Sequence, residues 1–267
     1  MNWNALDISI LGPALLAGVL VLSTHVPLGR EVLKRGIIFI DLAVAQLAGL
    51  GVILASTLGW EIHGYPAQAA AFTAAIAGAI FLTWVERNLK DVQEAIIGVM
   101  FVLAATASMV LLANNPRGGD ELKELLVGQI LWVDLAALGP AAVMSLVVLV
   151  AWFFLRHKIQ RIGFYILFSL SVTVSVQLVG VYLVFSSLII PALPTRNLGS
   201  KGLWAAYAVG LAGYILGMLL SALMDLPTGP VIVWSMAVVA VIVGPSREHP
   251  LENVLRRHDE RSHPLRS

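Results

Sequence analysis

Long apolar runs separated by short polar stretches recur along the whole chain. A helix needs roughly 20 apolar residues to cross the ~30 Å hydrocarbon core of a bilayer, and most of these runs approach that length. The pattern predicts nine helical segments, at residues 8–28, 37–58, 67–84, 92–113, 138–155, 162–180, 181–195, 203–223 and 229–244. The seventh segment would cover only roughly 22 Å. We therefore expect an all-α, polytopic transmembrane helical bundle of about eight full spans plus a short or re-entrant helix.

The connections between these segments differ in charge. Lys and Arg gather in four of them, at residues 29–36, 85–91, 156–161 and 196–201. The connections at 59–66 and 114–126 carry no such excess. Because positively charged loops tend to remain in the cytoplasm, the pattern predicts an external N-terminus and cytoplasmic basic connections. Residues 125–137, after the second external loop, are expected to form a short amphipathic or re-entrant helix.

The chain divides into a single transmembrane domain, residues 1–246, and a polar C-terminal tail, residues 247–267, which we expect to be flexible. The side of the membrane on which the tail lies depends on the seventh segment. If that segment crosses, the tail is cytoplasmic; if it is re-entrant, the tail is external. The five arginines of the tail favour the cytoplasm.

Composition narrows the class of protein. The chain is 58% hydrophobic and 12% charged, with a mean hydropathy of +0.87, which is far from the values of soluble domains. It contains no cysteine, so disulfides and thiolate metal ligands are excluded. The sequence shows no P-loop and no set of nucleophile, base and orienting group. We therefore expect a protein of the cell (inner) membrane that is not an enzyme and has no nucleic-acid partner.

Polar side chains inside the apolar segments are the candidate functional residues, because such groups are costly in hydrocarbon unless they meet a partner or a ligand. Asp41 is either a helix-start carboxylate paired with Arg35 or Lys34, or a pathway residue. Gln46 is either an interhelical hydrogen-bonding group or a pathway residue. Five residues separate the two, so they lie about 140° apart around a regular helix and cannot both point squarely into one small site.

Other polar positions leave the same choice open. Gln177 lies mid-span and can join helices or line a pathway. Glu94 lies in the first turn of its helix, where carboxylates also serve as caps. Asp225 precedes a turn into the last segment. Gly213 and Gly217 form a small-xxx-small pattern that suits close packing, either within the bundle or at a dimer seam.

Five segments, in order, carry a resemblance to a known family. They are PLGREVLKRGIIFIDLAVAQLAGLG (27–51), EAIIG (94–98), LVGQILWV (126–133), GVYLVFSSLIIPALPTR (180–196) and DLPTGP (225–230). Together they resemble the permease subunits of zinc, manganese and iron ABC transporters. The residues that carry the last two motifs are Gly180, Pro191, Arg196, Asp225, Pro227, Gly229 and Pro230.

The resemblance implies a permease subunit that imports a divalent metal ion, which is the substrate rather than a cofactor of this chain. The resemblance also implies three partners: a second copy of the chain in a homodimer, a cytoplasmic ATP-binding subunit that powers alternating access, and an extracytoplasmic metal-binding protein. ATP would be bound by the partner subunit. The alternative on the same fold is an ATP-independent facilitator or secondary transporter of a metal or another small solute.

The chain departs from the family pattern in two places. The family has an aspartate and a histidine as metal ligands four residues apart, and the aligned positions here are Leu42 and Gln46. The carboxylate stands one residue earlier, at Asp41. The resemblance makes Gln46 and Asp41 the candidate metal-ligating residues, although an amide is a poorer ligand than imidazole for zinc. The second departure is the connection 156–161, which is too short for the family's cytoplasmic docking segment.

Overall fold

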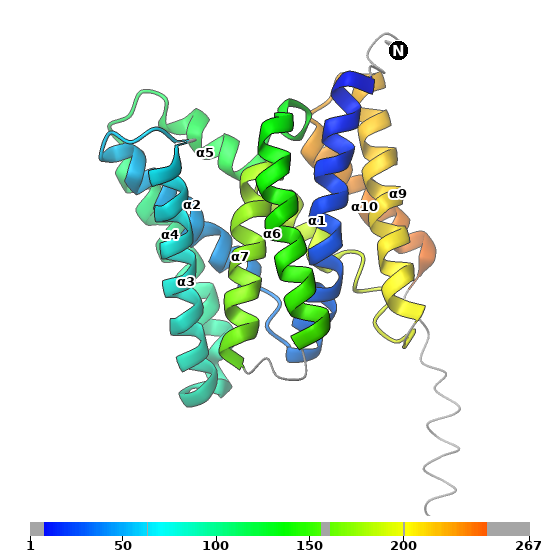
Figure 1. Cartoon of the computed structure of the whole chain (residues 1–267), viewed down its shortest axis with the longest axis horizontal. Helices are drawn as coiled ribbons and strands as arrows, with labels where there is room; N and C mark the ends of the chain where they lie inside the picture. Colours follow the sequence, from blue (N-terminus) through cyan, green and yellow to red (C-terminus); the bar gives the residue numbers. More distant parts are fainter. Residues whose placement is uncertain (1–7, 63, 156–160, 200, 245–267) are drawn as a thin grey trace, which may run out of the picture.

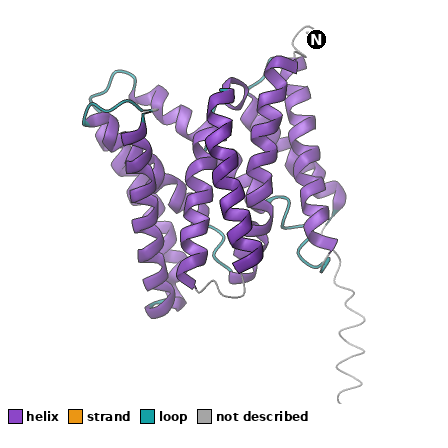
Figure 2. Cartoon of the chain, viewed as in Figure 1, coloured by secondary structure: helices purple, strands orange, loops and turns teal. Residues whose placement is uncertain are grey.

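The computed structural model describes residues 8–62, 64–155, 161–199 and 201–244, and every regular element in these ranges is helical (Figures 1 and 2). The α-helices are α1 (Ile8–Arg35), α2 (Ile40–Thr57), α3 (Tyr65–Asn88), α4 (Gln93–Leu112), α5 (Gly118–Val127), α6 (Leu135–Leu155), α7 (Arg161–Val179), α8 (Val181–Ile189), α9 (Lys201–Met224) and α10 (Thr228–Val243). Two short 3-10 helices are η2 (Lys90–Val92) and η3 (Ile130–Trp132). The tail, residues 247–267, lies outside the described residues.

Seven of the described helices are long and apolar enough to cross a membrane, and α10 is a shorter apolar helix. The predicted all-α polytopic bundle is therefore confirmed. We call the end at which α1 and α3 finish and α2, α4 and α9 begin the basic end, because Lys and Arg cluster there. The opposite end, where α2 and α7 finish and α5 lies, is called the cavity end (Figure 1).

Two helices form the interior of the bundle. In α2, 67% of the spanning window is buried, and in α7 61%, against 17–39% in the other five long spans. Helix α7 lies against α3, α6 and α2, and α2 lies between α3 and α4. Since the outward faces of the other helices carry exposed apolar side chains that suit lipid, polar groups on α2 and α7 are inside the protein.

The small-xxx-small pattern of Gly213 and Gly217 lies where α9 packs against α10. Gly213 and Gly217 face α10, and a Cβ at either position would clash with the backbone of Met236 or Ile232, respectively. The pairing Gly213–Met236 and Gly217–Ile232 also shows that α9 and α10 run antiparallel. These glycines therefore permit close packing within the bundle, and the dimer-seam interpretation is not needed for them.

The seventh predicted segment crosses as a short helix followed by turns. Helix α8 follows Gly180, which lies against Gly128 at the cavity end with φ +81°. After Ile189 the chain continues in turns to Gly199. There the Arg30 guanidinium donates hydrogen bonds to the Thr195 and Gly199 carbonyl oxygens, both at 3.0 Å. Helix α9 thus starts at the basic end, and α10 returns toward it.

The amphipathic helix after the second external loop lies earlier than predicted. The expected helix at 125–137 is wrong, and so is the expected loop at 114–126, because α5 occupies Gly118–Val127. Two carboxylates, Asp120 and Glu121, lie in its first turn, where the helix dipole favours negative charge. Gly128, with φ +69°, ends the helix. Only the short η3 turn follows before α6.

Candidate functional site

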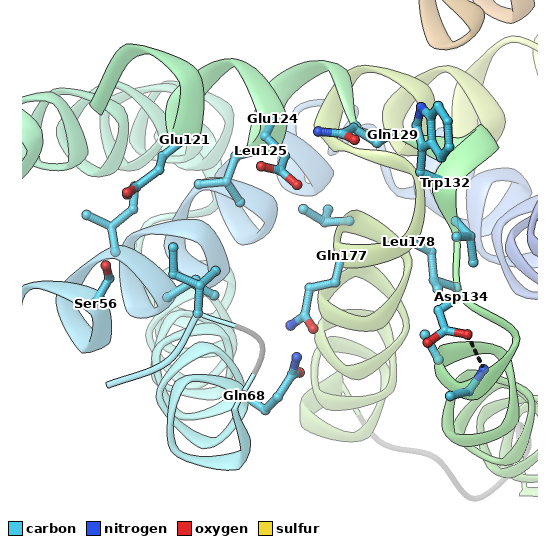
Figure 3. A pocket seen from close by; sticks show the side chains of 18 residues that line it. Ser56, Gln68, Glu121, Glu124, Leu125, Gln129, Trp132, Asp134, Gln177 and Leu178 are labelled. Atoms are coloured by element: carbon cyan, nitrogen blue, oxygen red, sulfur yellow. Dashed lines mark hydrogen bonds between the residues drawn. The ribbon is translucent and has the colours of Figure 1, made fainter. Parts of the chain in front are cut away.

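A cavity of about 610 Å³ opens at the cavity end, beneath α5 (Figure 3). Its walls come from the end of α2, the start of α3, α5, the segment from Gly128 to Ala137, and the end of α7. The polar residues that line it are Ser56, Gln68, Glu121, Glu124, Gln129, Asp134 and Gln177. The remaining lining is apolar and includes Leu125 and the exposed Trp132.

Gln177 is the residue by which the interior helix α7 contributes a polar side chain to the cavity. Its neighbours Val176 and Leu178 are 3% and 8% exposed, whereas Gln177 itself is exposed. An exposed amide on a buried helix points into an open space rather than into lipid. In Figure 3 the side chains of Gln177 and Gln68 point toward one another across this space. The cavity therefore presents two amides, one from α7 and one from α3.

Three carboxylates, Glu121, Glu124 and Asp134, are among the lining residues. Glu121 Oε1 accepts a hydrogen bond from Asn115 Nδ2 (2.9 Å), and Asp134 Oδ1 accepts one from the Ala136 backbone N–H (3.1 Å) at the start of α6. Glu124 lies one turn after Glu121 and is exposed. Clustered negative charge at the mouth of a cleft raises the local concentration of cations. Within the described ranges, however, no three His, Cys, Asp or Glu side chains gather closely enough to hold a metal ion.

The α2 wall of the cavity leads inward to Gln46. Ile53 lines the cavity, and a Cβ at Gly49 would lie 3.6 Å from Leu125, another lining residue. Gln46, Gly49 and Ile53 share one helix face, since they are three, four and seven residues apart. Gln46 is buried at 6% exposure and lies about 10 Å along the helix from Ile53. It therefore stands below the cavity on the same face of α2.

Helix α7 continues inward with hydroxyl groups. Thr173 and Ser169 follow Gln177 at four-residue intervals on one face, and they are 0% and 1% exposed. Neither hydroxyl has a hydrogen-bond partner among the described residues, and the same holds for Ser171. A buried polar group without a partner is costly.

Asp41 lies at the other end of α2, near the basic end. It is fully buried, and within the described part of the chain neither carboxylate oxygen has a hydrogen-bond partner. The predicted pairing with Arg35 or Lys34 is not formed in the described residues. Arg35 instead contacts Glu31 (Nε–Oε1, 3.0 Å) and Glu86 (Nη1–Oε1, 3.8 Å). The helix-start interpretation of Asp41 thus gains no salt bridge from Arg35.

Glu94 also lies at the basic end. Its Oε1 accepts a hydrogen bond from the Phe39 backbone N–H at 3.2 Å, so it caps the start of α2 rather than only its own helix. Its Oε2 is buried without a hydrogen bond in the described residues. The four predicted pathway residues therefore follow one another from end to end instead of forming one site. Gln177 lines the cavity, Gln46 lies below it, and Asp41 and Glu94 lie at the basic end.

The basic end is filled by an aromatic and ionic cluster that the sequence did not reveal. The Arg35 guanidinium lies 4.1 Å from the centroid of the Phe164 ring. Phe164 is fully buried and contacts the Tyr165 and Phe168 rings at centroid distances of 5.5 and 5.7 Å. The Tyr165 hydroxyl accepts a hydrogen bond from Gln93 Nε2 (2.7 Å). This cluster joins α1, α4 and α7 at that end.

The remaining motif residues shape turns. Asp225 has φ +54° at the α9–α10 turn, which is closed by Ser221 Oγ with the Leu226 carbonyl and the Thr228 hydroxyl, both at 2.6 Å. Pro227 precedes α10, and Gly229 and Pro230 lie in its first turn. Pro191 is buried in the turns after α8, and Arg196 is exposed there. These residues position helices and do not line the cavity.

Comparison with known proteins agrees with this architecture. The model of the ABC 3 transport family matches residues 7–164 and 155–244, and its two pieces meet at the connection between α6 and α7. The "Probable iron transport system membrane protein" of Haemophilus influenzae is 25% identical over 222 residues, covering 75% of this chain and 80% of that protein. The "High-affinity zinc uptake system membrane protein ZnuB" of the same organism is 25% identical over 256 residues, covering 87% and 96%.

A solved structure shows the same fold. The structure described as "PsaBC from Streptococcus pneumoniae in complex with Fab" matches with a TM-score of 0.70 at 19% identity, over 92% of this chain and 94% of that one. The resemblance drawn from the five sequence motifs is therefore confirmed, as is a multi-pass location in the cell membrane. The chain belongs to the ABC 3 transport family.

Proposed function

We propose that this chain is the permease subunit of an ABC importer of divalent metal ions such as zinc, manganese or iron. The observation that carries the proposal is Gln177, an exposed amide on a buried helix. Gln177 lines the cavity, and the buried polar residues Gln46, Thr173 and Ser169 lie deeper in the bundle. The named relatives that transport iron or zinc support a metal as cargo. An extracytoplasmic binding protein would deliver it to the carboxylates at the entrance.

The difference between the two ends supports alternating access. The cavity end is open, whereas Arg35, Phe164 and Tyr165 close the basic end. Passage requires this cluster to separate after the cavity has closed above the cargo. Because such a population shift needs a source of differential free energy, we assign it to a cytoplasmic ATP-binding subunit that acts on a homodimer of this chain.

The test is uptake in cells. Deletion of the gene should abolish high-affinity accumulation of one of the radioactive metals ⁶⁵Zn, ⁵⁴Mn or ⁵⁵Fe, and the wild-type chain should restore it. The tagged chain should also recover an ATP-binding subunit from its native membrane. Unchanged accumulation of all three metals would contradict metal import, and failure to recover an ATPase would contradict the ABC mechanism.

One observation favours a second candidate, an ATP-independent facilitator on the same fold. Helix α6 ends at Leu155 and α7 begins at Arg161, so little chain is left where the family resemblance expects an ATPase-docking segment. Such a facilitator should carry metal down a gradient in liposomes that contain the purified chain alone. Absence of gradient-driven flux there, together with ATP-dependent flux in the complex, would eliminate it.

A further inference from the structure

The cavity and the positions below it are rich in amide and hydroxyl groups. The amides are Gln46, Gln68, Gln129 and Gln177, and the hydroxyls nearest the pathway are Ser56, Ser169 and Thr173. An amide both donates and accepts hydrogen bonds, and a hydroxyl does so too. Both are weak direct ligands for zinc, which prefers imidazole, thiolate and carboxylate. The described lining is therefore better suited to hydrogen bonding than to tight coordination.

The carboxylates are placed for attraction at a distance. Glu121 is held by Asn115 and Asp134 by the start of α6, as described above. Figure 3 shows Glu121 and Glu124 projecting from α5, with Gln177 and then Gln68 below them and Asp134 to one side of Gln177. A cation drawn in by this negative entrance would next meet the uncharged pair of amides.

The size of the cavity also exceeds what a bare ion fills. Six waters at about 30 Å³ each occupy roughly 180 Å³, and the cavity measures about 610 Å³. A cation with its first shell of water therefore fits with room to spare. Mg²⁺ shows that proteins can hold a divalent cation that keeps several of its waters.

We propose that the cavity recognises its cargo as a hydrated divalent cation, through hydrogen bonds from metal-bound water to Gln68 and Gln177. This inference rests on the proposed function and names the form of its substrate. Outer-sphere recognition of this kind lets the ion move on to Gln46, Thr173 and Ser169 without breaking bonds to strong protein ligands. It also gives a chemical role to an amide at the position where the family resemblance expects a histidine.

The test uses hexaamminecobalt(III), whose six ammonia ligands do not exchange and which can bind only through hydrogen bonds and charge. The full chain in lipid nanodiscs is dialysed against this complex, and bound cobalt is counted by elemental mass spectrometry. We expect saturable binding of one complex per chain that excess Mn²⁺ displaces. The double variant Gln68→Leu/Gln177→Leu should bind at least tenfold more weakly. Absent saturable binding, or equal binding by the double variant, would overturn the inference.

Control measurements distinguish the loss of the two amides from a change of charge and from misfolding. Asn88→Leu removes an exposed amide at the basic end and should leave cobalt binding unchanged. Circular dichroism and size-exclusion chromatography report whether each variant is folded. Glu124→Gln should weaken binding at low salt more than at high salt, because its effect is electrostatic, whereas the loss caused by the double amide variant should persist at both.

A second measurement reads coordination directly through visible absorption of Co²⁺. In the wild type, bound Co²⁺ should keep the weak bands of the six-coordinate aqua ion. The variant Gln68→His/Gln177→His should shift these bands, because imidazole is a stronger-field ligand than water, and should strengthen them only if the coordination number falls. Bands in the wild type that are shifted from those of the aqua ion, or strengthened, would show protein–metal bonds and overturn the inference. These results are independent of cellular uptake, so a failure of metal import and a failure of outer-sphere recognition remain distinguishable.

Discussion

The two ends of α7 differ in the size and polarity of their side chains. Near the basic end the helix carries the large rings of Phe164, Tyr165 and Phe168, which fill the space between helices. Toward the cavity end it carries Ser169, Thr173 and finally Gln177. Small and polar side chains leave room that rings would occupy. The cavity therefore lies at the end of α7 that carries small and polar side chains, and the ring cluster lies at the other end.

The first prediction concerns the close contact between Gly180 and Gly128 at the cavity end. Gly180→Val should reduce the amount of folded protein severely, because a Cβ there would clash with the Gly128 backbone and the residue holds φ +81°. A β-branched residue in that conformation costs on the order of 1–3 kcal/mol before any clash. Fluorescence-detected size-exclusion chromatography measures the folded fraction. Gly139→Ala, where nothing lies near the added Cβ, is the control and should behave as wild type.

The second prediction tests the polar positions below the cavity. Gln46→Leu should reduce metal uptake by about tenfold, which corresponds to the loss of roughly one hydrogen bond to the passing cargo. Folding should be retained, since leucine suits a buried helix face. Uptake of radioactive metal per folded chain is the measurement. Wild-type uptake by this variant would show that Gln46 serves only to join helices.

The third prediction concerns the contacts of Arg35 at the basic end. Arg35→Met removes the contacts with Glu31, Glu86 and the Phe164 ring. These contacts are partly exposed, and together they are worth on the order of 1 kcal/mol, so we expect a several-fold shift toward an inward-open state. Because the natural chain has no cysteine, single cysteines report access cleanly. Thiol labelling of Ala43→Cys should accelerate in the Arg35→Met background.

Ser56→Cys, in the cavity lining, provides the comparison for that experiment. It should label readily in the wild-type background and more slowly when Arg35 is replaced, since the two ends are not open at once. If labelling at both positions rises together, the substitution has loosened the bundle. If neither changes, the cluster at the basic end does not hold it closed.

The fourth and smallest effect concerns a single hydroxyl. Thr173→Val keeps the shape of the side chain and removes a buried hydroxyl that has no partner in the described residues. We expect an unchanged or slightly higher melting temperature, together with a few-fold loss of uptake. Calorimetry or thermal-shift measurement in detergent reports the first, and transport assays the second. A large drop in melting temperature would instead assign Thr173 a structural role.

Sequence patterns predicted the spans well because bilayer thickness imposes a strong and local constraint on apolar length. Gln177 was recognised for a similar reason, as an isolated amide inside an apolar run. Helix α5 was misplaced because a short surface helix is specified by its caps, and here by Gly128, rather than by hydropathy. The cavity as a whole could not be predicted, since Gln68, Glu124 and Gln177 meet only through packing of distant segments.

The contacts of Arg35 are a second case in which the sequence did not predict the correct partner. Its position after an apolar run suggested a partner for Asp41, because sequence proximity is the only guide before a fold is known. In the structure the guanidinium contacts Glu31, one turn earlier on the same helix, and two distant groups, Glu86 of α3 and the Phe164 ring of α7. Sequence neighbours compete with such distant partners, and the arrangement of the helices decides between them.

The short helix α8 has a consequence for how the protein is made. Its nine residues, followed by turns, leave backbone groups that lipid cannot satisfy. Arg30, which belongs to the first helix, supplies hydrogen bonds to the Thr195 and Gly199 carbonyls. The segment from 181 to 199 is therefore a poor candidate for independent insertion into the bilayer. We expect it to insert against helices that are already in place, among them α1, whose Arg30 precedes Thr195 by 165 residues.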